Sequence, residues 1–76
     1  MSYVVVFEKT ETGYSAYAPD LPGLGVAGDT MAEVEQLIRE GVEVYLEEIS
    51  HRGLSIPQAT TTVGTVEPRT DFAKAS

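Results

Sequence analysis

The sequence predicts a small α+β domain in which three short strands precede one long helix and a further strand follows it. Three observations support this β-β-β-α-β order. Near the N-terminus, segments rich in β-branched and aromatic residues alternate with short turns that contain glycine. A capping sequence then opens a long stretch with apolar residues at helical spacing. A short run of threonine and valine comes last.

The first two strands are expected over residues 3–8 and 14–18, which are rich in valine, alanine and tyrosine. The intervening segment from Thr10 to Gly13 contains the glycine that favours a tight turn. The two strands are therefore expected to form an antiparallel hairpin.

A second turn is indicated by the motif Asp20-Leu21-Pro22-Gly23. Pro22 presets φ at the first central position of a type II turn, and Gly23 supplies the positive φ that the second position requires. Only a short third strand, over residues 24–27, fits between this turn and the helix.

The helix is expected to start after Thr30, because Thr30 and Glu33 have the spacing of a capping box. Asp29 adds negative charge near the positive end of the helix dipole. Gly53 is expected to follow the helix as the residue with left-handed backbone. The apolar stripe consists of Val34, Leu37, Ile38, Gly41, Val42, Tyr45, Leu46 and Ile49.

A last strand is expected over residues 60–66, and Pro68 ends it. The domain is accordingly expected to cover residues 1–66, with residues 67–76 as a flexible tail. Val63, Val66 and Phe72 are apolar side chains outside the helix stripe. We expect them to contact a partner.

The predicted sheet has two apolar faces. In the first strand Val5 and Phe7 point one way and Val4 and Val6 the other. One helix can cover only one face, and so small a domain buries only about 60% of its unfolded surface. We therefore expect another protein chain, most simply a second copy, to cover the other face; side-chain stems and loops are the alternative.

The composition disfavours several classes of function. A formal net charge of −7 opposes binding to nucleic acid and suits a basic protein partner. The outer helix face carries Glu40, Glu43 and Glu47, which form either a solvated surface or a docking site for basic side chains. Cysteine is absent, which excludes disulfides and thiolate metal sites. No segment resembles a membrane span or a signal peptide, so a cytoplasmic protein is expected.

No catalytic, cofactor or metal-binding motif is present. The single histidine, His51, has no second histidine or cysteine with which to form a metal site. Asp20 and Asp29 flank the third strand and are expected to be structural. A small hydrolase or ligand-binding protein that uses the Asp20–Asp29 loop is the less favoured alternative.

The same residues resemble the toxin-binding domain of HicB-type antitoxins. The resemblance covers nearly the whole chain to about Val66. Its most specific part is Asp20 to Gly23 together with Gly28 to Thr30 at this spacing. The similar segments are Tyr3–Lys9, Gly13–Gly23, Gly28–Thr30, Glu43–Glu47 and Gly53–Pro57.

The resemblance implies a partial RNase H-like fold and an antitoxin that binds and blocks HicA, a small RNA-cleaving toxin. It also implies a dimer or tetramer without enzymatic activity. Full-length members usually carry a C-terminal DNA-binding domain, for which this sequence has no room, so DNA binding is not implied. An oligomeric domain without a toxin partner is the alternative function.

Overall fold

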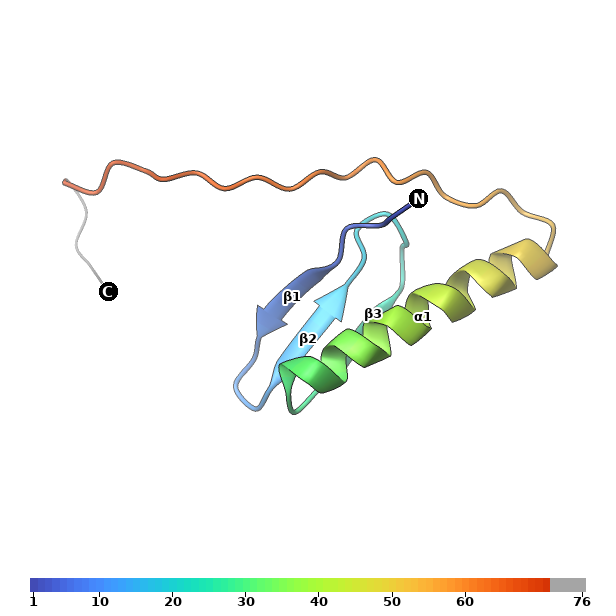
Figure 1. The fold of residues 1–76 in the computed structure, drawn as a ribbon, viewed down its shortest axis with the longest axis horizontal. Coiled ribbons are helices and arrows are strands. Elements are labelled where there is room, and N and C mark those ends of the chain that lie inside the picture. Colours follow the sequence, from blue (N-terminus) through green and yellow to red (C-terminus); the bar gives the residue numbers. More distant parts are fainter. Residues whose placement is uncertain (72–76) are drawn as a thin grey trace.

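A computed structural model describes residues 1–71 of the chain (Figure 1). The strands β1 (Val6–Lys9), β2 (Tyr14–Tyr17) and β3 (Gly25–Gly28) precede the helix α1 (Met31–His51). They form an antiparallel sheet in the order β1-β2-β3. The α+β class, with three strands and one helix, is confirmed.

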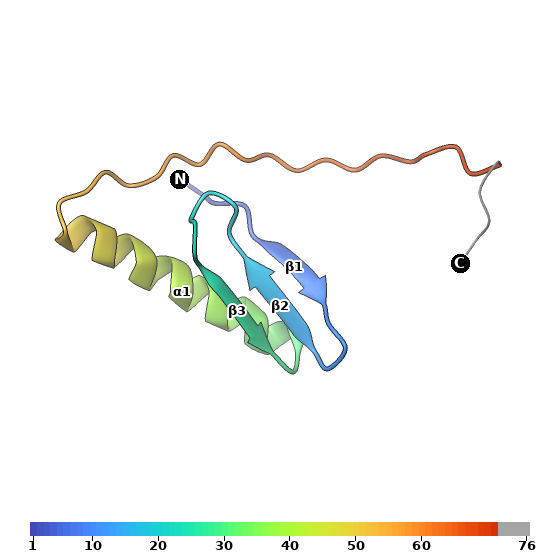
Figure 2. The same cartoon turned by 180° about the vertical axis from the view of Figure 1, so that it is seen from behind.

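The register of the sheet decides which side chains share a face. Ala16 lies opposite Phe7 on one side and Val26 on the other, so these three point the same way. Val6 and Tyr17 are paired and point to the opposite face. In the view of Figure 2, helix α1 lies behind the sheet.

Strand β1 begins at Val6, three residues later than expected, and the reason lies in its partner. Strand β2 ends at Tyr17, the residue opposite Val6. The next carbonyl, that of Ala18, accepts the backbone N–H of Leu21 at 3.0 Å in a turn. Residues 3–5 therefore have no β2 residue opposite them.

Helix α1 packs against β2 and β3 but not against β1. Val34 and Ile38 from the helix meet Ala16 from β2 in a small buried cluster. Among the described residues only Ala18 and Leu21 are buried besides these three. The core is therefore small.

The helix N-terminus has the expected cap. The Thr30 hydroxyl accepts the backbone N–H of Glu33 at 3.1 Å. In return the Glu33 carboxylate accepts the N–H of Asp29 at 3.3 Å, one residue before the cap. These bonds satisfy backbone donors that would otherwise lack a partner.

Gly53 ends the helix as expected, with φ of 70°. Its N–H donates to the Ser50 carbonyl at 3.0 Å, and the N–H of Leu54 donates to the Ile49 carbonyl at 3.1 Å. This pair of bonds is the Schellman motif. The turn before β3 also forms as expected, with Gly23 at φ 87° and the Leu24 N–H donating to the Leu21 carbonyl at 3.2 Å.

The expected last strand is not paired with the sheet. No helix or strand is assigned over the described residues that follow Gly53, including residues 60–66. The backbone N–H groups of Thr60 and Thr61 donate to the Asp20 carboxylate rather than to a neighbouring strand. Beyond them the chain runs on in extended form, away from the sheet in both views (Figures 1 and 2).

Candidate partner-binding surfaces

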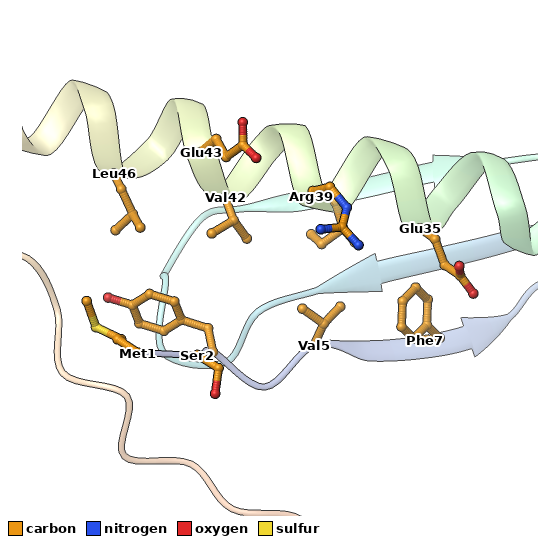
Figure 3. Close-up of a pocket in the computed structure, with 11 residues that line it drawn as sticks. Met1, Ser2, Val5, Phe7, Glu35, Arg39, Val42, Glu43 and Leu46 are labelled. Atoms are coloured by element: carbon orange, nitrogen blue, oxygen red, sulfur yellow. The ribbon is translucent and has the colours of Figure 1, made fainter.

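An open groove of about 550 Å³ lies between β1 and α1 (Figure 3). It exists because α1 covers β2 and β3 and leaves the β1 side of the sheet free. Phe7 of β1 and Val5, just before β1, line one side, and Ile38, Val42 and Leu46 line it from the helix. Its surface can therefore accept apolar side chains.

The rim of this groove is charged. Glu35, Arg39 and Glu43 project from α1 along the side of the groove (Figure 3). Tyr3 also lines the groove, and its hydroxyl donates to the Pro57 carbonyl at 2.5 Å. An apolar floor with a polar rim is typical of protein-binding sites.

The outer edge of β1 borders the groove and is open, since β2 is the only described strand that pairs with β1. An open edge offers unpaired N–H and C=O groups to an added strand. Such a strand would place alternate side chains over the groove. Groove and edge together form one site, which we call the β1 site.

The outer face of the sheet is uncovered in the described part of the chain. It carries the paired Val6 and Tyr17, and Tyr17 is 42% exposed. Ala27 on β3 is exposed as well. No described element packs on this side, which agrees with the expectation that one helix covers one face only.

Helix α1 presents an acidic stripe to solvent. Glu40, Glu43 and Glu47 are exposed, as expected, and Val44 among them is 65% exposed. Their spacing of three and four residues places all four on one helix face. The Gln36 amide donates to the Glu40 carboxylate at 2.9 Å. Glu43 also borders the groove, so the stripe and the β1 site meet.

Asp20 has a role that the sequence did not reveal. Its carboxylate accepts the N–H of Thr60 at 3.1 Å and that of Thr61 at 3.0 Å. Both hydroxyls donate to it too, at 3.1 Å from Thr60 and 2.7 Å from Thr61. These bonds, that of the Thr61 backbone first, lower the pKa of Asp20 below its ordinary 3.8. Asp20 thus fastens the C-terminal segment to the turn after β2.

The other motif residues have structural roles, and Asp20 and Asp29 do not converge. The pairings of Tyr14 with Gly28 and of Tyr17 with Gly25 place these two carboxylates at opposite ends of the sheet. The Pro22 carbonyl accepts the Tyr45 hydroxyl at 3.0 Å, which ties the turn to the helix. Within residues 1–71 no cluster of three or more His, Cys, Asp or Glu side chains is placed to hold a metal ion.

Val63 and Val66 are 75% and 86% exposed in the segment that leaves the body. Phe72, the third apolar residue expected to contact a partner, lies outside the described residues. In the described part of the chain, no helix combines the length and hydrophobicity needed to cross a bilayer.

Comparison with known proteins identifies relatives of this chain. A UPF0150 protein of Synechocystis sp. is 36% identical over 58 residues, which are 75% of this chain and 73% of the relative. A UPF0150 protein of Archaeoglobus fulgidus is 35% identical over 48 residues, 62% of this chain and 70% of the relative. A 14.9 kDa protein from the rep–hol intergenic region of Haemophilus phage HP1 is 30% identical over 59 residues, 78% of this chain and 44% of the relative.

No solved structure matches the chain significantly. The family model of the HicB-like antitoxins of bacterial toxin–antitoxin systems matches residues 3–76, almost the full sequence. The chain belongs to the HicB-like antitoxin family.

Proposed function

We propose that this chain is an antitoxin module that binds a HicA-type RNA-cleaving toxin and blocks it by occlusion, without catalysis. The acidic stripe of Glu40, Glu43 and Glu47 around the exposed Val44 is the observation that carries this proposal. An RNA-cleaving enzyme needs basic side chains to hold phosphates. A stripe of carboxylates with an apolar centre suits such a surface and competes with RNA for it.

The charge of the whole chain supports the same function. Its formal net charge of −7 would accelerate encounter with a basic protein and oppose direct binding to RNA or DNA. Occlusion needs no reactive group, and the described residues hold no metal-binding cluster. We place the chain in the cytoplasm, where its RNA-cleaving target would act.

Copurification and growth rescue with a HicA-type toxin encoded beside this chain test the proposal. The test variant is Glu40→Gln, Glu43→Gln, Glu47→Gln. The control is Glu8→Gln, Glu11→Gln, Glu67→Gln, which removes the same charge from exposed sites away from α1. We expect the test variant to bind about tenfold or more weakly, since each lost charge pair contributes up to about 1 kcal/mol, and the control to bind like the parent.

A parent chain that neither copurifies with the toxin nor restores growth would contradict the antitoxin function. Equal weakening by both triple variants would assign the effect to net charge and not to the stripe. Measuring affinity at two ionic strengths separates these cases further, because exposed charge pairs weaken as salt rises.

The second candidate is a self-associating domain without a toxin, and the uncovered sheet face favours it. Val6 and Tyr17 on that face have no described covering layer. We propose that the chain forms a dimer or tetramer in either case. Light scattering across a dilution series measures this independently of any toxin.

A further inference from the structure

Residues 62–71, which follow Thr61, form an arm in which no helix or strand is assigned. Every residue of this C-terminal arm is exposed. Figures 1 and 2 both show it running past the N-terminal end of the sheet and away from the body. Thr62, Val63, Thr65 and Val66 are β-branched and favour a strand. The arm therefore has the composition of a strand but no sheet to join.

The dimensions of the chain point to missing contacts. A folded monomer of 8.2 kDa is expected to expose about 4,500 Å², whereas this chain exposes 6130 Å². The radius of gyration is 15.9 Å, against about 11 Å for a compact domain of this length. The excess of about 1,600 Å² is twice what each partner buries in a standard interface. Such an area is sufficient for a stable dimer.

The β1 site has the features needed to receive this arm. Its edge is open, and both faces of the sheet beside it are apolar: Val5 and Phe7 toward the groove, Val6 and Tyr17 on the outer face. Side chains alternate along a strand, so Val63 and Val66, three residues apart, point to opposite faces. A strand formed by the arm would place one valine over each apolar face.

The arm is directed away from its own β1 site. Four hydrogen bonds to Asp20 hold Thr60 and Thr61 at the turn after β2. From there the chain continues straight while β1 diverges from it in both views (Figures 1 and 2). The arm is thus free to reach another molecule without breaking the Asp20 contacts.

We propose that the C-terminal arm of one copy docks on the β1 site of a second copy, and that the exchange is reciprocal. The arm adds a strand to the edge of the partner's β1 and covers both apolar faces there. A reciprocal exchange is closed by a two-fold axis, so it yields a dimer and not a filament. This assembly goes beyond the proposed antitoxin function and does not depend on it.

The first test is the mass of the purified chain by sedimentation equilibrium, with no toxin present. We expect twice the chain mass of 8.2 kDa for the parent. The variant Val63→Ser, Val66→Ser should weaken the dimer by about 100-fold or more, because four buried valines are lost per dimer. The control Thr62→Ser, Thr65→Ser alters the same arm but keeps both valines, and its dimer should hold.

A parent that stays monomeric at micromolar concentration would overturn the proposal, as would a dimer that the double valine variant leaves intact. Because the arm is fully exposed in the single chain, these variants should leave the helical signal of the domain in circular dichroism unchanged.

The second test decides between exchange and docking within one chain. The sequence has no cysteine, so single cysteines can be placed freely. Copies carrying Val63→Cys or Val66→Cys are mixed with a differently tagged copy carrying Phe7→Cys. We expect a mixed disulfide with at least one of the two arm variants, and none when the recipient is Val44→Cys on the acidic stripe.

A chain that carries Phe7→Cys together with Val63→Cys or Val66→Cys tests docking of the arm within one molecule. If it forms only an internal disulfide at high dilution, and the mixed copies form none, the arm docks on its own β1 site and the exchange is refuted. A mixed disulfide with Val44→Cys as strong as with Phe7→Cys would equally refute the assigned site.

Discussion

Replacing Leu21 by alanine should destabilise the domain more than any change on its surface. Leu21 is fully buried in the turn between β2 and β3, with 0% of its surface exposed. A buried Leu→Ala change costs about 2–5 kcal/mol, because the lost methyl groups leave a cavity. A domain of this length has a total stability of only about 4–11 kcal/mol. The substitution should therefore remove a large part of it.

Urea unfolding followed by circular dichroism measures this loss. With a slope near 1 kcal/mol per molar urea for so small a protein, the midpoint should fall by about 2 M or more. Leu54→Ala is the matched control, since Leu54 is 57% exposed and should cost less than about 0.5 kcal/mol. Equal midpoints for the two variants, measured at one protein concentration, would refute the assignment of Leu21 to the core.

Three further predictions concern single contacts. Asp20→Asn should loosen the C-terminal segment, because an amide nitrogen cannot accept the threonine N–H and O–H groups; faster proteolysis after Thr61 would report it, and an unchanged rate would contradict the anchor. Since folding lowers the pKa of Asp20, the contribution of its carboxylate to stability is present above pH 3.8 and is lost as pH falls through the lower folded pKa. Over that pH range the NMR signals of the Thr60 and Thr61 amides should shift in the parent but not in Asp20→Asn. Gly53→Ala should cost about 1–2 kcal/mol by thermal unfolding, because φ is 70° there, whereas Ser55→Ala next to the cap should be nearly neutral.

Local patterns predicted most of the fold because they act over a few residues. Thr30 with Glu33, Pro22 with Gly23, and Gly53 each determine a cap or a turn from adjacent chemistry, and each forms as expected. The strand ends were less well predicted. Tyr3 to Val5 have strand composition, but pairing depends on where the partner strand turns away, and β2 turns after Tyr17.

The candidate sites could be predicted only where exposure follows from helical periodicity. Glu40, Glu43 and Glu47 lie on the face opposite the apolar stripe, so their exposure was readable from spacing alone. The contact between Asp20 and Thr61 joins residues forty positions apart, and no local pattern encodes it. The groove was equally hidden, because it depends on the helix being offset toward β3.

The small core and the uncovered surfaces have one physical cause. A sheet of three four-residue strands is too wide for one helix, so covering β2 and β3 leaves β1 bare. The five buried side chains of the described chain cannot by themselves offset much of the entropy of ordering it. If the arm exchange holds, part of the stability comes from a second copy, and the unfolding midpoint must then rise with protein concentration. In that case three residues of the acidic stripe, Glu40, Val44 and Glu47, stay outside the exchanged strands because they do not line the groove, whereas Glu43 lies at its border. A dimer would then keep Glu40, Val44 and Glu47 of each copy available for toxin.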